Sequence, residues 1–328
     1  MANLHNEFQA FHEKVALSPG KKESLRQSRD AIRSRIENYF KEKLKVDVPK
    51  FHAQGSFAMG TTVNPLDGEF DLDDGVYLQH LNEYDESSWP TPEKVHSWIV
   101  EATDGYTKEK PIDKRTCVRV RYAGQYHIDL PSYATLNGKP MLAEKGENGW
   151  HSSDPIALTE WFTGQVQEQG DQLRRVVRYV KAWADFQSVK RGKMSTSLIL
   201  TVLVAQNFRS HERDDISLAN TAKAIFDAIR FVVSVYNPVD GTEELTQRLT
   251  DEEKKRFQDA IADLANDAAK AVNDESKKEA SKLWQGQLGD RFPLVNDDEE
   301  EEKQKKENAD RLAAFYAPRK PTKPWGSN

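Results

Sequence analysis

The segment that most constrains this chain runs from Gln54 to Leu78 and reads QGSFAMGTTVNPLDGEFDLDDGVYL. Its second half is a strand-like run, EFDLDDGVYL, in which Asp71 and Asp73 are separated by one residue. Because side chains alternate between the two faces of a strand, both carboxylates should project to the same side. Two like charges held that close favour a hard divalent cation between them, above all Mg²⁺. The segment therefore predicts a strand that presents a metal site.

A Gly-Ser turn precedes the two acids, at Gly55 and Ser56. Its backbone N–H groups and its hydroxyl are the donors that an anionic phosphate needs. A later β-like run, QYHIDLPSY, supplies a third acid, Asp129, and two metal ions need more than two carboxylates. A lone Asp-x-Asp pair is weak evidence, and Asp129 alone could cap the turn before Pro131. The combination favours a phosphoryl-transfer site.

The composition restricts the class of protein. A chain of 328 residues is long enough for two domains, no run approaches the ~20 apolar residues of a membrane span, and the N-terminus lacks the apolar core of a signal peptide. The single cysteine, Cys117, excludes an intrachain disulfide and fits a reducing cytosol, so we expect a cytoplasmic protein with a packed thiol. The net charge of −6 argues against a protein that coats long DNA or RNA and favours a small anionic substrate.

A long amphipathic helix is predicted from Gly20 to Leu44, because apolar residues recur at helical spacing on one side of it. For its basic side, a solvated face is the favoured interpretation and a phosphate- or RNA-facing stripe is the alternative. The apolar positions are Leu25, Ile32, Ile36 and Phe40, and the basic ones are Arg26, Arg29, Arg33 and Lys41.

The strand-like runs of the N-terminal half surround the acidic segment. KVDVPKFHAQ predicts a short strand that leads into the Gly-Ser turn, and Asp74-Gly75 suggests a bend or bulge after the second acid. TPEKVHSWIVEA predicts a helix from Thr91 to Ala102. TCVRVRYA and QYHIDLPSY predict a hairpin that turns around Ala123-Gly124 and could bring the third acid beside the first two.

From residue 154 onward the pattern becomes helical. The run GDQLRRVVRYVKAWADF predicts a core-facing helix, and Lys181 lies beside its apolar stripe, where ordinary snorkelling would explain it. The residues 195–197 resemble a helix start, and further helices are expected over 218–235 and 250–288. The resulting division is an N-terminal domain over 1–153, a helical lobe over 154–293 and an acidic, flexible tail over 294–328. The expected apolar stripe comprises Leu173, Val176, Val177, Val180 and Ala184.

The motifs QGSF, EFDLDDGVYL and YHIDLPSYA resemble the nucleotidyltransferase core of the polymerase-β-like superfamily. Within it, the chain is similar to the cGAS/DncV-like nucleotidyltransferases, bacterial cyclic-oligonucleotide synthases of CBASS anti-phage defence. The later runs WHSSDPIALTEWF, RRVVRYVKAWAD, KMSTSLILTVLV and LGDRFP extend this resemblance to Pro293. It implies an α+β fold, in which a polymerase-β-like core of mixed sheet and flanking helices packs on a C-terminal helical lobe.

The resemblance also implies roles for particular residues. Asp71, Asp73 and Asp129 would bind two Mg²⁺ ions, with Mn²⁺ as an alternative, and Asp129 would help to deprotonate the attacking ribose hydroxyl. Some related enzymes carry an aromatic residue for base stacking at the position of Met59, so base contacts could fall to other residues here. The candidates are Met59, Tyr133, Tyr77 and Phe57, of which the aromatic residues could equally be core residues. The residues implied to hold the triphosphate are Gln54, Gly55, Ser56, Lys181, Ser195 and Ser197.

The function implied by the resemblance is a Mg²⁺-dependent nucleotidyltransferase that joins nucleoside triphosphates into a cyclic oligonucleotide and releases pyrophosphate. The resemblance allows a cyclic di- or trinucleotide as the product, and the DncV-like form of the motif, DLDDGVYL, favours a dinucleotide made from ATP, GTP or a pyrimidine nucleotide. A partner from the same operon could modify or bind the C-terminal tail, and a membrane or a long nucleic acid is not expected as a partner. One alternative is a nucleotidyltransferase that modifies RNA, protein or a small molecule. Another is a non-enzymatic module on a degenerate core, against which the intact acids argue.

Overall fold

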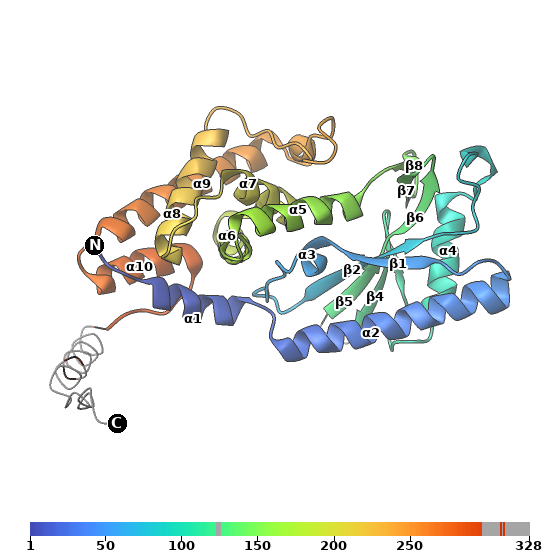
Figure 1. Ribbon diagram of the computed structural model, residues 1–328, viewed down its shortest axis with the longest axis horizontal. Coiled ribbons are helices and arrows are strands. Elements are labelled where there is room, and N and C mark those ends of the chain that lie inside the picture. The colour runs from blue at the N-terminus through green and yellow to red at the C-terminus, as the bar shows by residue number, and fades with distance from the viewer. Residues whose placement is uncertain (123–125, 297–308, 310, 312–328) are drawn as a thin grey trace, which may run out of the picture.

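The computed structural model describes residues 1–122, 126–296, 309 and 311. Two lobes lie side by side, one built on a β-sheet and the other on helices (Figure 1). The predicted hairpin turn at Ala123-Gly124 and nearly all of the predicted tail lie outside the described residues. Within the described part, no helix is both long and apolar enough to cross a membrane.

The sheet lobe is built from the first half of the chain, and the helical lobe from the second half together with the N-terminal helix. The first half contains α1 (His5–Val15), α2 (Pro19–Asn38), a π-helical turn (Tyr39–Leu44), β1 (Lys50–Gln54), α3 (Gly55–Ala58), β2 (Phe70–Tyr77), a 3₁₀ turn (Glu86–Ser88), α4 (Pro92–Thr103), β3 (Ile112–Asp113), β4 (Val118–Tyr122), β5 (Tyr126–Leu130), β6 (Ser132–Leu136), β7 (Lys139–Glu144) and β8 (Gly149–Ser152). The second half contains α5 (Pro155–Gln169), α6 (Gln172–Arg191), α7 (Ser197–Asn207), α8 (Asp214–Ile229), a 3₁₀ turn (Leu245–Arg248), α9 (Asp251–Asn273) and α10 (Lys277–Leu288).

The sheet is mixed and has eight strands, in the order β3-β4-β5-β2-β6-β7-β8 with β1 paired to β2. Strand β2 is central, because it pairs parallel with β5 and β6 and antiparallel with β1. Its register with β1 is unbroken through Asp74 and Gly75, so the bulge suggested there is absent from this pair of described strands. Instead, Pro131 separates β5 from β6, because proline has no N–H to continue a ladder.

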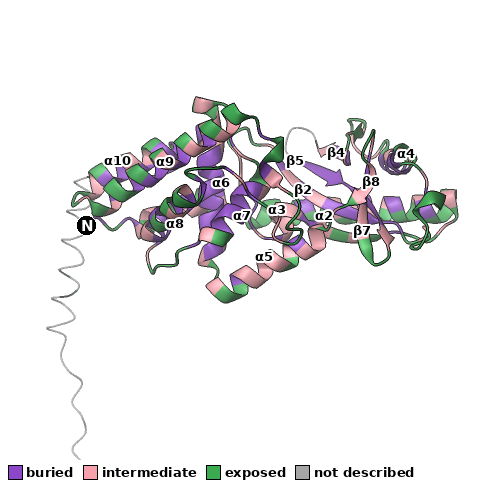
Figure 2. Cartoon of the chain, turned by 90° about the horizontal axis from the view of Figure 1, so that it is seen from above, coloured by how far each residue is buried: buried purple, intermediate pink, exposed green. Residues whose placement is uncertain are grey.

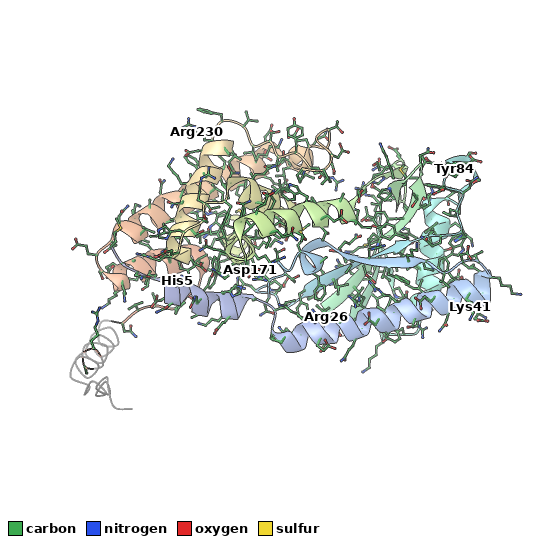
Figure 3. All side chains as sticks on the ribbon, viewed as in Figure 1. His5, Arg26, Lys41, Tyr84, Asp171 and Arg230 are labelled. Atoms are coloured by element: carbon green, nitrogen blue, oxygen red, sulfur yellow. The ribbon has the colours of Figure 1, made fainter. Side chains whose placement is uncertain are left out.

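Helix α2 lies along one side of the sheet, and the π-helical turn prolongs it to Leu44 (Figure 1). Its predicted apolar residues are all fully buried. Arg26 and Lys41 lie on the outer face with side chains 52% and 72% exposed, as expected of a solvated face (Figure 3). Arg33 is different, because it turns inward and binds the buried carboxylate of Asp74 through Nε at 2.7 Å and Nη2 at 2.5 Å. This ion pair fastens α2 to the central strand.

Each lobe has its own hydrophobic core, and buried residues are concentrated on α6, α7 and the sheet (Figure 2). The predicted domain boundaries stay predictions, but α1 departs from the expected N-terminal domain. Its buried residues Phe8, Phe11 and Val15 pack in the core of the helical lobe, beside Tyr179 and Phe292. The apolar face of α1 packs there against aromatic side chains of that core.

Two helix predictions in the second half were wrong in their bounds. The helix expected over 250–288 is two helices, because the chain leaves α9 in an extended conformation at Asp274 and Ser276 caps α10. The helix expected over 218–235 begins earlier, at Asp214, and ends at Ile229. The helix start at 195–197 is confirmed, and Thr196 is its cap: its hydroxyl accepts from the N–H of Ile199 at 3.4 Å.

Candidate active site

Strand β2 presents Asp71 and Asp73 on the face of the sheet opposite its apolar side chains. Asp73 lies opposite Asp129 of β5 in the parallel register, and Asp71 lies opposite His127. Because residues directly opposite in a ladder share a face, the three acids lie on one face, as the sequence predicts. The other face carries Leu72 and neighbouring apolar residues, which pack in the core under α2 and α4. The face that carries the three acids is named the reaction face.

The Gly-Ser turn meets this face directly, because Gln54 at the end of β1 is paired with Asp73. Gly55 comes next with φ of +65°, a conformation that glycine adopts without strain. A Cβ at this position would overlap the Asp73 carboxylate oxygen Oδ2. The turn therefore needs a glycine for two reasons, backbone conformation and space. Ser56 lies in the single helical turn α3, where its hydroxyl is 2.9 Å from the Thr62 hydroxyl.

The carboxylates of Asp71 and Asp73 have no hydrogen bond or ion pair within the described part of the chain. Burial, together with the charges of Asp71 and Asp129, raises the pKa of Asp73 well above its usual value. A nearby cation would relieve this penalty, and carboxylate oxygens are the ligands that Mg²⁺ prefers. Asp71 and Asp73 therefore fit a divalent cation.

The third acid, Asp129, differs from Asp71 and Asp73 because its carboxylate has a hydrogen-bond partner. Asp129 accepts two hydrogen bonds from Arg119 of β4, with Oδ1 2.6 Å from Nε and Oδ2 2.7 Å from Nη2. Consistent with this, no three His, Cys, Asp or Glu side chains of the described residues converge into a preformed metal site. The three predicted metal ligands therefore lie on one face of the sheet, but their side chains do not converge on a common metal position.

His127 was not predicted as a site residue, although it lies on the reaction face between Asp71 and Arg121. It is buried, and neither ring nitrogen has a hydrogen-bond partner in the described structure. Burial lowers the pKa of His127, so the ring is neutral at neutral pH. Alternation along YHIDL could have placed His127 on the same side as Asp129, whereas its neighbours on other strands follow only from the register.

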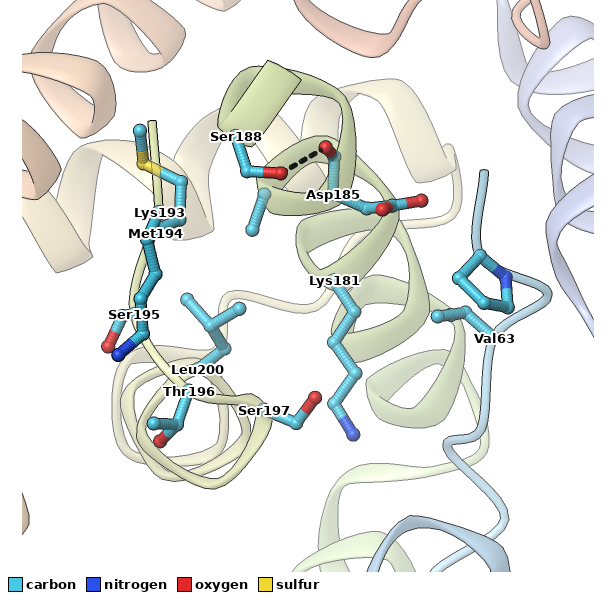
Figure 4. A pocket seen from close by; sticks show the side chains of 12 residues that line it. Val63, Lys181, Asp185, Ser188, Lys193, Met194, Ser195, Thr196, Ser197 and Leu200 are labelled. Carbon is cyan, nitrogen blue, oxygen red and sulfur yellow. Dashed lines mark hydrogen bonds between the residues drawn. The ribbon is translucent and has the colours of Figure 1, made fainter. Parts of the chain in front are cut away.

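Lys181 lies on α6 and is buried, which sets it apart from an ordinary snorkelling lysine. Its ammonium donates to the Thr61 hydroxyl at 3.0 Å. Burial lowers the pKa of Lys181 to about 7, although the charges of Asp71 and Asp73 raise it. The Lys181 side chain extends towards the α7 start and lines a cavity of about 480 Å³ with Ser195 and Ser197 (Figure 4). The buried Ser195 hydroxyl has no partner within the described residues.

Helix α6 holds the segment after the Gly-Ser turn through a polar stripe at helical spacing. Arg174 donates to the carbonyl of Met59 at 3.1 Å, and Arg178 donates to the carbonyl of Gly60. Lys181 then reaches Thr61, and Asp185 accepts from the N–H of Leu66 at 2.9 Å. The spacing i, i+4, i+7, i+11 in RRVVRYVKAWAD could have revealed this stripe, but its target could not be read from the sequence. The residues of the stripe are Arg174, Arg178, Lys181 and Asp185.

A second cavity, of about 460 Å³, is lined by residues of the sheet and by residues of the segment 240–248 of the helical lobe. Gln54, Asp73, Asp129 and Tyr133 line it. Tyr133 is buried, stacks on Tyr77 with ring centroids 4.7 Å apart, and is held by the Gln54 amide at 3.1 Å. This cavity is large enough to suggest a nucleoside-sized ligand.

The other candidates for base contact are less accessible. Met59 is 3% exposed and packs in the core of the helical lobe, so it presents little surface to a base, and a base contact there stays a prediction. Phe57 is partly buried against the sheet-lobe core and lies under the guanidinium of Arg26.

Cys117 is a packed thiol, as expected: burial raises its pKa to about 12, which excludes a thiolate nucleophile at neutral pH.

A Gly-Ser turn that abuts acids on neighbouring parallel strands, beside a helical lobe that contributes a buried lysine, defines the nucleotidyltransferase class. Residues 49–133 match the family model of the cyclic GMP-AMP synthase DncV-like nucleotidyltransferase domain. Residues 170–300 match the model of the cyclic GMP-AMP synthase C-terminal domain. The chain therefore belongs to the cGAS/DncV-like nucleotidyltransferases, and the expected fold is confirmed.

Individual relatives agree with this assignment. A cyclic GMP-AMP synthase from Escherichia albertii is 29% identical over 214 residues, which cover 63% of this chain and 48% of that protein. A cyclic AMP-AMP-GMP synthase from Enterobacter hormaechei is 20% identical, and the match covers 98% of both chains. The crystal structure of apo Vibrio cholerae DncV is 22% identical with a TM-score of 0.75 and covers 89% of this chain and 96% of that one. The chain spans about half the length of the cyclic GMP-AMP synthases that it matches.

Proposed function

We propose that this protein joins nucleoside triphosphates into a cyclic oligonucleotide and releases pyrophosphate. The observation that carries the proposal is the set of three acids on one sheet face, against which the Gly55-Ser56 turn is packed. The substrates are ATP and GTP or a pyrimidine nucleotide, and the product is a cyclic dinucleotide. The name cyclic GMP-AMP synthase, shared by several relatives, supports a dinucleotide.

The residues divide the work between phosphate binding and proton transfer. The N–H groups and the hydroxyl of the Gly55-Ser56 turn hold the donor triphosphate, and Lys181 meets it as a point charge. Bound at Asp71, Asp73 and Asp129, two Mg²⁺ ions, or Mn²⁺, would align the ribose hydroxyl with the α-phosphate and neutralise the leaving pyrophosphate. Asp129 helps to take the proton from the attacking hydroxyl.

The proposal also includes the cellular setting of the reaction. We place the protein in the cytoplasm, where nucleoside triphosphates are available and where a single free thiol is stable. Its product would act as a second messenger in anti-phage signalling. A partner that binds or modifies the C-terminal tail also belongs to the proposal, and mass spectrometry of protein purified with its native operon tests it. A tail that is unmodified and unbound throughout infection would contradict the proposed partner.

The experiment for the reaction uses the full chain with radiolabelled ATP, GTP, CTP and UTP and Mg²⁺, and then phosphatase. We expect a small, phosphatase-resistant product, because a cyclic oligonucleotide has no terminal phosphate. Labelled RNA, labelled protein or a labelled small-molecule acceptor would favour the alternative nucleotidyltransferase. The variant with Asp71→Asn and Asp73→Asn should be inactive, while Asp259→Asn on the exposed side of α9 serves as the matched control. Full activity of the double variant would exclude both functions.

A further inference from the structure

The pairing of Arg119 with Asp129 is built into the sheet. The two residues lie directly opposite each other in the antiparallel β4–β5 ladder, so their side chains share the reaction face. Both carboxylate oxygens of Asp129 are occupied by the guanidinium, at 2.6 and 2.7 Å. Bidentate bonds of this kind are among the stronger ones in proteins. Lys114 adds a second positive charge, with its Nζ 3.7 Å from Oδ2 of Asp129.

The acids of the reaction face therefore fall into two groups. Asp71 and Asp73 carry no partner among the described residues, whereas Asp129 is fully compensated. The neighbouring cation on the same strand, Arg121, does not contact any of these acids and pairs with Glu69 at 2.9 Å instead. Arg119 is thus the cation of β4 that acts on the site.

We propose that Arg119 is an internal counter-cation that occupies Asp129 and must release it before the third acid can ligate a metal ion. This inference rests on the proposed function, because it concerns the metal site that the reaction requires. The ladder fixes the backbones of both residues, so the exchange needs only a rotation of side chains. Arg119 then lowers the affinity of the free enzyme for divalent cations. A nucleotide that brings its own negative charge would draw the guanidinium away and open the complete site.

A different role for Arg119 predicts the opposite sign. If Arg119 orients Asp129 for metal binding, as groups around metal ligands commonly do, its removal should weaken metal binding. If Arg119 merely stabilises the sheet, its removal should lower the stability and leave metal affinity unchanged. The direction of the change in metal affinity therefore separates the three roles.

The experiment measures Mn²⁺ binding to the full chain without nucleotide, by electron paramagnetic resonance of the free ion. Arg119→Met removes the charge and all donors while keeping an unbranched apolar side chain. We expect Mn²⁺ to bind about tenfold more tightly to this variant, since hydrogen bonds to charged groups are worth about 1.5–3 kcal/mol and tenfold corresponds to about 1.4 kcal/mol. Arg121→Met is the matched control, because it removes the same charge two residues away without touching Asp129.

The same substitution in a protein that lacks the Asp129 carboxylate tests whether Arg119 acts through Asp129. In an Asp129→Asn protein, Arg119→Met should no longer tighten Mn²⁺ binding, because the carboxylate that it releases is gone. Unchanged or weaker binding by Arg119→Met, an equal gain in Arg121→Met, or a gain that persists with Asp129→Asn would each overturn the proposal. If Arg119→Met does not fold, Lys114→Met should give a smaller gain in the same direction, and no gain there overturns it. A wild-type chain that makes the cyclic product while these gains are absent would leave the proposed function intact.

Discussion

Single residues in this site are limited by space as well as by charge. The backbone of Gly55 lies so close to the carboxylate of Asp73 that the added methyl of an alanine would overlap Oδ2. The same methyl would be strained at a φ of +65°. Any relief must move either the phosphate turn or a metal ligand, and both belong to the proposed reaction.

We therefore expect Gly55→Ala to lower the rate of nucleotidyl transfer by about 10²-fold, which is the effect of a misplacement near 1 Å. Single-turnover assays with saturating nucleotide and Mg²⁺ measure it. Gly164→Ala is the control, because a Cβ at that helical position meets no atom within 4 Å and φ is ordinary. Wild-type rates in Gly55→Ala would show that the turn and Asp73 do not act together.

Lys181 gives a prediction about protons. Burial lowers its pKa to about 7, so the side chain is mostly neutral at pH 8 and charged below about pH 6. A bound triphosphate favours the charged ammonium form of Lys181. Nucleotide binding at pH 8 should therefore be accompanied by uptake of up to about one proton, whereas at pH 6 the ammonium already holds that proton. Calorimetry of a non-hydrolysable nucleotide in buffers of different ionisation enthalpy measures this uptake.

The control for this titration is Lys181→Arg, which remains charged at both pH values. The wild type should take up more protons than Lys181→Arg at pH 8, and the difference should disappear at pH 6. Equal uptake by the two proteins at pH 8 would mean that Lys181 does not meet the phosphates.

For single residues, the sequence predicts those positions that depend on short-range periodicity. Alternation along a strand is enough to place Asp71 and Asp73 on one side, and the glycine before Ser56 marks the close turn. Arg119 could not be found in this way, because its place opposite Asp129 depends on which strands become neighbours, whereas alternation in YHIDL could have placed His127 beside Asp129. Met59 was considered from the family position, and its burial in the core of the helical lobe could not be read from the sequence.

Among the elements, α6 links the two lobes. One side of this helix is the apolar stripe expected from the sequence, and all five of its positions are buried. The polar stripe binds the segment after the Gly-Ser turn at successive helical turns, through Arg174, Arg178, Lys181 and Asp185. The phosphate turn is therefore held by hydrogen bonds that come from the other lobe.

Arg178 is the centre of this stripe, since it binds the Gly60 carbonyl and is 2.7 Å from Nε2 of His12. We expect Arg178→Met to lower kcat/KM for nucleotide about tenfold, mainly through KM, because charged hydrogen bonds contribute about 1.5–3 kcal/mol. Steady-state kinetics at several nucleotide concentrations separate KM from kcat. Arg191→Met, on the same helix but paired with the exposed Asp263, is the control. A change in stability with unchanged kinetics would assign Arg178 a purely structural role.

Element boundaries agree with local signals where such signals exist. Thr91 before Pro92 and Thr196 before α7 cap their helices as the sequence indicates. The break between α9 and α10 was missed, although residues 273–279 include no apolar side chain and Ser276 caps the new helix. The strands β7 and β8 were missed as well, since each is short and lacks regular alternation.

On the scale of the whole molecule, the N-terminal segment ties the lobes together. Helix α1 packs in the helical lobe, and α2, only a few residues later, packs against one face of the sheet (Figure 1). The family motifs predict both lobes but not this crossing, because it depends on long-range contacts of α1 that no local pattern specifies. The ring of Phe8 lies within 4.8–5.2 Å of those of Trp284, Phe292 and Tyr179.

This arrangement predicts the cost of removing that ring. Phe8 is fully buried, so Phe8→Ala should lower the free energy of unfolding of the helical lobe by about 3–5 kcal/mol. Urea unfolding monitored by the fluorescence of Trp183 and Trp284, after replacement of the other tryptophans by phenylalanine, reports on this lobe. Gln9→Ala on the exposed side of α1 is the control. A loss below about 1 kcal/mol would mean that α1 is not docked in solution, since a ring buried in an aromatic cluster cannot be removed so cheaply.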